Sequence, residues 1–160
     1  MARQSLQPSR DPGDYDFTHR LRTRFAETDA MGIIHHAAYL PYLEEARVEY
    51  LRAIGHPYDA VRAEGAEGTE GVEFAVLEAS VHYRKALRFD EVVHVHMVVG
   101  AVTRTTFQVA YLLVADGHVR ATAVTVHGAV DRAGRPARLP AWVRREHAAP
   151  RSRPAASAAP

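Results

Sequence analysis

The period of the hydrophobic pattern changes along the chain. Residues 17–25 alternate between apolar side chains and arginines, with Phe25 as the last apolar member of the series, which predicts a half-exposed strand. In residues 37–54 apolar side chains recur every three or four positions, as expected for one face of a helix. Gly55 is a natural helix stop, so the sequence predicts one strand followed by one long helix.

Pro41 narrows the position of the helix start. Proline breaks a helix interior but is tolerated in the first turn, so the helix is expected to begin close to residues 36–38. Residues 56–71 predict a loop with one helical turn. Beyond them, alternating and continuous apolar runs predict four strands, with a break in the alternation near Phe74. Asp116-Gly117 is a hairpin signal between the last two strands. The predicted strands are residues 72–85, 91–102, 105–115 and 118–130, and turns are expected at 103–105 and 131–136.

This order of elements predicts an α+β fold. We expect an antiparallel sheet of about five strands that wraps around the long helix on one face. The sheet edges would stay open, and pairing between copies is the usual remedy, so at least a homodimer is expected. Residues 16–142 are predicted to form a single domain, between a flexible N-terminal tail at 1–15 and a flexible C-terminal tail at 143–160.

Composition excludes several classes of function. A net charge of +1 over 160 residues gives no overall field that favours nucleic acid or an anionic membrane. No apolar run approaches the length of about 18 residues that a transmembrane helix needs. The chain has no cysteine, which removes disulfides, thiolate metal sites and a cysteine nucleophile. A cytoplasmic location is expected from this composition.

Familiar catalytic and metal-binding motifs are absent. Ser80 is the only serine in the expected domain, and its neighbours do not form a G-x-S-x-G elbow. His94 and His96 share one strand face at a spacing that can chelate a metal, but no glutamate follows them as in a cupin-like site. His35 and His36 are two further candidate metal ligands. For both pairs a non-metal role is preferred, and no metal site or cofactor is predicted.

Asp29 has two interpretations. A carboxylate ahead of a helix is most often a cap or turn former. Asp29, however, precedes the expected helix start by several residues, and Gly32 between them permits a backbone conformation or a close approach that a side chain would block. A loop that doubles back would bring the carboxylate beside the unpaired N–H groups of the helix N-terminus. A carboxylate and fixed backbone donors together suit acyl transfer.

The segment "ETDAMGIIHHAAYLPYLEEAR" resembles the signature of hotdog-fold acyl-CoA thioesterases. The resemblance is closest to the branch with 4-hydroxybenzoyl-CoA thioesterase and the bacterial Tol-Pal-associated acyl-CoA thioesterases. In that pattern an acidic segment and D-x-x-G precede a His or Tyr that opens a helix containing A-x-Y and an acidic-Ala-Arg run. "ASVHYRKALRFDEVVHV" and "DGHVRATAVTVHGAVDRAGRPARLP" continue the likeness, which covers roughly residues 17–140. His35 stands where an aromatic residue such as Tyr is common, and Met31 replaces a small residue.

The resemblance implies a homodimer or homotetramer with active sites between subunits. Asp29 would be the catalytic nucleophile or general base. The backbone N–H at His36 would polarise the thioester carbonyl, and the His36 side chain would orient substrate or water. The residues expected to bind the acyl part of the substrate are Met31, Gly32, His35 and Tyr39. The residues expected to meet the coenzyme A phosphates are Arg84, Lys85 and Arg88 in one turn, with Arg104 behind them.

The function implied is therefore hydrolysis of a small-molecule acyl-CoA, with a short, medium-length or aromatic acyl group, to the free acid and coenzyme A. Coenzyme A would enter as part of the substrate and not as a separate cofactor. Two alternatives stay open: hydrolysis of an acyl carrier protein thioester, and a non-catalytic acyl-binding module on the same fold. A hotdog hydratase would need a different arrangement of His and acid on the helix, which this sequence lacks.

Overall fold

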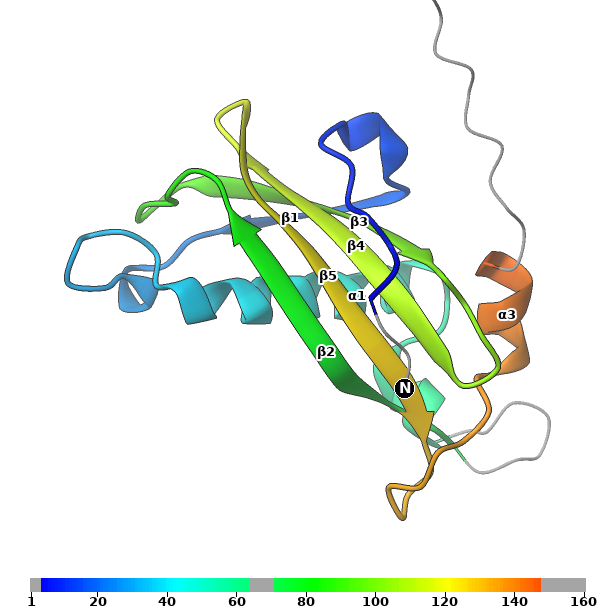
Figure 1. Cartoon of the computed structure of the whole chain (residues 1–160). Helices are drawn as coiled ribbons and strands as arrows, with labels where there is room; N and C mark the ends of the chain where they lie inside the picture. The colour runs from blue at the N-terminus through cyan, green and yellow to red at the C-terminus, as the bar shows by residue number, and fades with distance from the viewer. Residues whose placement is uncertain (1–3, 64–70, 148–160) are drawn as a thin grey trace, which may run out of the picture.

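A curved antiparallel sheet and one long helix form the body of the protein (Figure 1). The computed structural model describes residues 4–63 and 71–147. In the described part the strands are joined in the order β1-β3-β4-β5-β2, so β1 and β2 are the two edges. Their bounds are β1 Phe17–Arg22, β2 Glu73–Tyr83, β3 Val92–Gly100, β4 Thr106–Ala115 and β5 His118–Val130.

The turns between strands follow the predicted signals. Asp116 and Gly117 both have positive φ, 50° and 67°, as a two-residue hairpin between β4 and β5 requires. The pairing of β2 with β5 is irregular between Val76 and Glu78, so the break expected near Phe74 lies a few residues further along. This bulge lets an 11-residue edge strand follow the curvature of the sheet.

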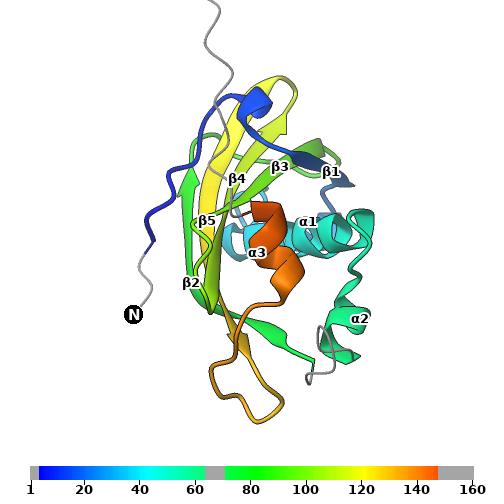
Figure 2. The ribbon, with the colours of Figure 1, turned by 90° about the vertical axis from the view of Figure 1, so that its right-hand side faces the viewer.

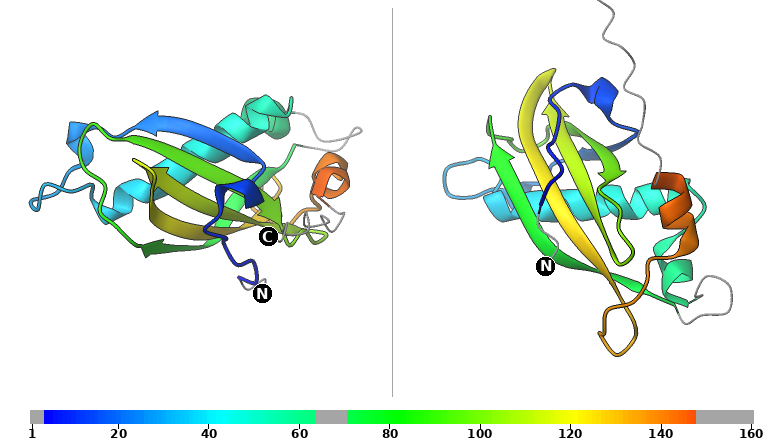
Figure 3. Two further views of the ribbon diagram at one scale, coloured as in Figure 1. Left: turned by 90° about the horizontal axis from the view of Figure 1, so that it is seen from above. Right: turned by 45° about the vertical axis from the view of Figure 1, so that its right-hand side comes forward.

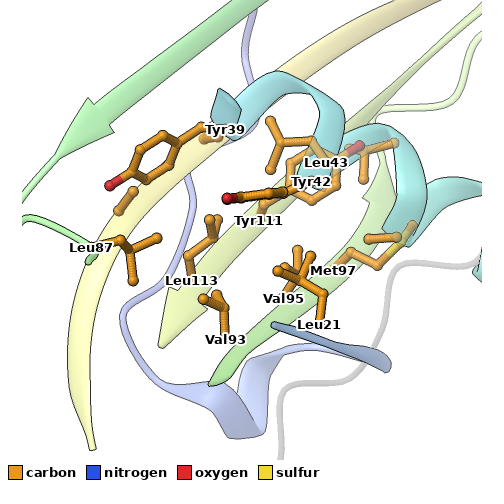
Figure 4. Close-up of a cluster of buried hydrophobic side chains, with 14 of the residues drawn as sticks. Leu21, Tyr39, Tyr42, Leu43, Leu87, Val93, Val95, Met97, Tyr111 and Leu113 are labelled. Carbon is orange, nitrogen blue, oxygen red and sulfur yellow. The ribbon is translucent and has the colours of Figure 1, made fainter. Parts of the chain in front are cut away.

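Helix α1, Tyr39–Ala53, lies against the concave face of the sheet (Figure 2). A single 3-10 turn, η3 His36–Ala38, leads into it, so the expected start is confirmed. Gly55 follows with φ of 81° and ends it as predicted. Ala46 is fully buried, and this small side chain lets the helix approach the strands closely. Figure 4 shows the buried side chains of α1 facing those of β3 and β4, which together fill the core.

The first strand ends earlier than its sequence pattern suggested. β1 stops at Arg22, and Phe25 is 74% exposed in a short 3-10 turn, η2 Phe25–Glu27. At this point the N–H of Thr23 still donates to the carbonyl of Glu91, in register with the β1–β3 pairing. The hydroxyl of Thr23, however, donates to the carbonyl of Arg88 at 2.6 Å and ties the chain to the segment after β2 where the strand ends.

Both ends of the expected domain carry more structure than tails would. At the N-terminal side, the backbone N–H groups of Ser5 and Leu6 donate to the Gln108 side chain on β4, and a 3-10 turn, η1 Pro12–Asp14, follows. At the C-terminal side, residues 143–147 belong to helix α3, Ala141–His147, and are not a flexible tail (Figure 3). The buried side chain of Val143 explains the difference, because it anchors the helix on the core.

The remaining expectations concern the region after α1 and the question of a membrane span. The single helical turn expected after α1 is α2, Tyr58–Ala63; residues 64–70 of the expected loop, like residues 1–3 and 148–160, lie outside the described residues. None of the helices in the described segments has the length and apolar character needed to cross a membrane.

Candidate active site

The segment before the helix folds back on itself as a tight loop. Thr28 and Ile34 form an isolated antiparallel bridge, and the N–H of Asp29 donates to the carbonyl of Ile33 at 2.8 Å. The N–H of His35 donates to the carbonyl of Glu27 at 2.7 Å. The loop therefore doubles back beside the start of the helix, as the sequence predicted, and projects from the body of the chain (Figure 1).

The Asp29 carboxylate helps to form this loop. Its Oδ1 accepts a hydrogen bond from the N–H of Met31 at 2.8 Å and a longer one from the N–H of Ile33 at 3.4 Å. The side chain is half-buried and has no ion-pair partner within the described residues. Asp29 is thus a turn former in this structure, and that role holds one carboxylate oxygen in place while leaving the other available for chemistry.

Gly32 permits the turn by its backbone conformation. Its φ is 73°, in the region that side chains disfavour, and its N–H donates to the carbonyl of Asp29 at 3.0 Å. A Cβ built on Gly32 would meet nothing within 4 Å. Of the two reasons that the sequence suggested for this glycine, the positive φ is therefore the operative one, and a close approach is not.

The helix start leaves one backbone donor free. The Nδ1 atom of His35 accepts from the N–H of Ala37 at 3.1 Å, and the N–H of Ala38 donates to the carbonyl of His35. Between them, the N–H of His36 has no acceptor among the described residues. The Tyr83 hydroxyl on β2 donates at 2.9 Å to the carbonyl of His36, which belongs to the following peptide group, and so ties this first turn to the sheet edge.

The two histidine side chains differ in their roles. His35 caps the 3-10 turn, whereas His36 is exposed and its ring centroid lies 4.0 Å from that of His35. Of the other residues expected to shape the acyl site, Met31 is 74% exposed and Tyr39 is only 3% exposed in the core against Tyr83. The assignment of these side chains to substrate binding stays a prediction.

Glu27 and Tyr42 support the loop and were not singled out from the sequence. The hydroxyl of Tyr42, on the buried face of α1, donates to Oε2 of Glu27, and the guanidinium of Arg24 binds Oε1 at 2.7 Å. Burial acts to raise the pKa of Glu27, but these bonds and one from the backbone N–H of Arg24 outweigh it, so the pKa lies below its ordinary value. Glu27 is therefore a fixed anion, and its carbonyl holds His35.

The connection between β2 and β3 lies beside the loop. The carbonyl of Leu87 accepts from the N–H of Ile34 at 2.8 Å. The guanidinium of Arg120 holds this connection from inside the fold, because it bonds the carbonyl of Ala86 and forms an ion pair with Glu91 at 2.6 Å. The basic side chains expected to meet coenzyme A, Arg84, Lys85 and Arg88, are all exposed on this connection.

Arg104 does not join that basic group within one chain. It follows β3, whereas Arg84, Lys85 and Arg88 precede β3, and the nine residues of this strand span roughly 30 Å. The expected position of Arg104 behind the other three is therefore wrong for a single subunit. Hairpin connectivity explains the error, since successive turns of an antiparallel sheet lie at opposite ends of the strand between them.

The two histidines on β3 face away from the helix. The ring centroids of His94 and His96 are 6.4 Å apart, and Nδ1 of His96 lies 2.7 Å from the hydroxyl of Thr18. Within residues 4–63 and 71–147, no three side chains of His, Cys, Asp or Glu gather as a metal site would require.

A cavity lies at the other end of α1 from the loop. Its volume is about 270 Å³, and its walls come from residues 44–51 of α1, the concave face of the sheet and α3. Most of the lining is apolar or aromatic, with contributions from Phe74 and Val76 near the start of β2. Its lining begins at Glu44, about 8 Å along α1 from Tyr39, and continues towards the end of the helix, away from the loop.

Comparisons with known proteins agree with the fold. The family model described as the thioesterase-like superfamily matches residues 23–146. A putative esterase of Aquifex aeolicus is 40% identical over 111 residues, which are 69% of this chain and 82% of that protein. The acyl-CoA thioesterase YbgC of Haemophilus influenzae is 30% identical over 93 residues, 58% of this chain and 65% of its own length. The crystal structure of a hypothetical protein from Aquifex aeolicus superposes with a TM-score of 0.73 at 38% identity, covering 80% of this chain and 96% of that one.

Proposed function

The chain belongs to the thioesterase-like superfamily, and from this premise we propose that it hydrolyses acyl-CoA thioesters to the free acid and coenzyme A. The sheet-and-helix arrangement is that of the hotdog fold. The observation that carries the proposal is the unpartnered N–H of His36 at the helix start, next to a loop that holds the Asp29 carboxylate by its own backbone.

The reaction needs little beyond these two groups. A thioester carbonyl is weakly stabilised by resonance and its thiolate leaves easily. In the proposed mechanism, Oδ2 of Asp29 either takes a proton from a water that attacks the carbonyl carbon, or attacks this carbon itself to give a mixed anhydride that water then hydrolyses. On both routes the coenzyme A thiolate leaves, and the Met31 N–H holds Oδ1. The His36 N–H donates to the oxygen that becomes negative. In known oxyanion holes one such donor lowers the activation barrier by about 3 kcal/mol.

The surroundings of the loop suit the rest of the substrate. The exposed His36 side chain would orient the substrate or a water molecule. Arg84, Lys85 and Arg88, on the connection bonded to the loop through Leu87, would neutralise coenzyme A phosphates. Met31, Gly32, His35 and Tyr39 would contact or support the acyl group near the thioester.

A second copy of the chain would complete the site. β2 is a sheet edge of 11 residues with exposed apolar side chains, including Val76 at 51% and Leu77 at 56%. Tyr83 at its end bonds the helix start, and Phe74 near its beginning lines the cavity. Antiparallel pairing of β2 with its copy would place the loop of one subunit beside the cavity of the other. We therefore propose a homodimer, with the acyl group in the partner's cavity; pairing of two dimers and a cytoplasmic location stay predictions.

The test is hydrolysis of a panel of acyl-CoA esters, followed with a thiol reagent, by the wild type and by Asp29→Asn. The amide oxygen of asparagine can still accept from the Met31 N–H, so the loop should keep its shape. We expect kcat/KM to fall by about 10² to 10⁴, the usual contribution of a positioned catalytic carboxylate.

Asp131→Asn is a matched control. Asp131 Oδ1 accepts from the N–H of Ala133, two residues on, as Asp29 does from Met31, but it lies in the turn after β5. The Asp131→Asn variant should hydrolyse acyl-CoA at the wild-type rate. If Asp29→Asn retained full activity, the carboxylate would not be catalytic. Binding of acyl-CoA without turnover would identify an acyl-binding module, and turnover restricted to an acyl carrier protein thioester would identify that carrier as the substrate.

A further inference from the structure

A chain of buried polar groups forms part of the cavity beneath α1. The guanidinium of Arg47 donates to the Tyr111 hydroxyl at 3.0 Å, and this hydroxyl lies 3.2 Å from that of Thr125. The Thr125 hydroxyl is 2.7 Å from Nε2 of His127. Tyr111, Thr125 and His127 are at most 2% exposed, and Arg47 and His127 line the cavity. The four side chains come from three elements, α1, β4 and β5, so only the fold brings them together.

Arg47 is the one charged member of this cluster. Burial, together with the positive charge of Arg47, lowers the pKa of His127 to about 3, so the imidazole is neutral near pH 7. Among the described residues Arg47 forms no ion pair, and although Glu44 also lines the cavity, its carboxylate does not approach the guanidinium within ion-pair distance. A half-buried cation is costly to desolvate without an anionic partner.

The rest of the cavity offers little to compensate this charge. Most of its walls are aliphatic or aromatic side chains, such as Met97, Phe107 and Trp142. His147 adds one more polar group to the cavity wall. Its Nδ1 is buried with no hydrogen-bond partner in the described part of the chain, and its Nε2 bonds the Tyr50 hydroxyl. An apolar cavity with one cation in its wall favours a guest with an apolar body and a polar, acceptor-rich end.

We propose that Arg47 selects acyl groups whose far end carries a carboxylate, the acyl part of a dicarboxylic acid monothioester. This inference rests on the proposed function, with the thioester at Asp29 of one subunit and the acyl group in the cavity of the other. A guanidinium binds a carboxylate through paired, charge-assisted hydrogen bonds. An acyl group that ends in a methyl would cover the cation without pairing it, and sites of this kind reject such analogues strongly. A cavity of about 150 Å³ holds benzene, so about 270 Å³ is ample for a chain of roughly six carbons.

The experiment compares adipyl-CoA with 6-methylheptanoyl-CoA. In the second ester an isopropyl group, with two methyls in place of the two carboxylate oxygens, ends a chain of the same length. Both kcat/KM and equilibrium binding are measured for the wild type, Arg47→Met and Arg47→Lys. We expect the wild type to prefer adipyl-CoA by at least about tenfold in both measurements. Arg47→Met should lose or reverse the preference, because methionine keeps the apolar stem without the charge. Arg47→Lys should retain part of it.

Arg52→Met is the control, because Arg52 lies on the same helix, pairs with Glu49 and does not line the cavity. It should behave as the wild type, and thermal unfolding of each variant checks that the fold is kept. Equal binding of the two esters by the wild type would overturn the inference, and so would an equal loss on both esters in Arg47→Met, which would mark a structural role. Selective binding of adipyl-CoA without hydrolysis of either ester would support the inference and contradict the proposed function instead.

Discussion

The buried histidine beneath α1 makes the stability of the fold depend on pH. His127 is 1% exposed, and its pKa in the folded chain is about 3, compared with about 6.5 for an unfolded histidine. The unfolded state therefore binds a proton at a pH where the folded state does not. The contribution to stability is complete above pH 6.5 and is lost as the pH falls towards 3.

The magnitude follows from the two pKa values. Each pH unit between them is worth 2.303RT, or about 1.4 kcal/mol. The titration of His127 alone therefore lowers the free energy of unfolding by about 2 kcal/mol between pH 7.5 and pH 5. The full loss would reach about 5 kcal/mol near pH 3. This is a large part of the 5–15 kcal/mol that is typical for a domain.

The assay is urea unfolding at pH 7.5 and pH 5, at one protein concentration, for the wild type and His127→Gln. Glutamine retains a polar atom near the position of Nε2, where it can still bond Thr125, but it does not titrate. Between pH 7.5 and pH 5 the free energy of unfolding should fall by about 2 kcal/mol more in the wild type than in the variant. The contributions of the carboxylates and of the other histidines are the same in both proteins and cancel in the comparison. His118→Gln, at the exposed first residue of β5, should lose as much stability between the two pH values as the wild type. Equal losses in the wild type and His127→Gln would refute the assignment of this pH dependence to His127.

Three further substitutions test the support of the loop, each by urea unfolding together with acyl-CoA hydrolysis. Tyr42→Phe removes a hydrogen bond to the Glu27 carboxylate and should lower stability by about 2 kcal/mol; an unchanged kcat/KM would show that this bond is not needed to position the loop. Arg120→Met leaves Glu91 without its ion-pair partner and should lower stability by about 3 kcal/mol, whereas a neutral result would mean that water replaces the guanidinium. Gly32→Ala should cost about 1 kcal/mol through its positive φ alone, since the added methyl has open space around it, and a much larger cost would point to a contact made by a second subunit.

The local sequence determined where the elements lie and how the loop turns. The start of the helix near His36 could be read from Pro41 and the apolar stripe, because propensity and periodicity act within a few residues. Asp29 and Gly32 could be read in the same way, since the bonds that these two residues make within the turn reach at most four positions along the chain. The turn at Asp116 and Gly117 is a third case, in which the two residues carry the required positive φ themselves.

Tertiary structure decided the features that depend on distant segments. β1 ends early where the Thr23 hydroxyl bonds the chain at Arg88, about sixty-five positions away, and no local pattern reports such a contact. Arg104 is separated from the other basic residues by the length of β3. Arg47 bonds Tyr111, and is linked through it to His127, only because the register of β4 with β5 brings these side chains together beneath α1. The sequence alone thus determined the element order and the geometry of the Asp29 loop. The cavity and its buried cation exist only because packing brings α1, α3 and the sheet together, since burial and charge pairing depend on every neighbouring element at once.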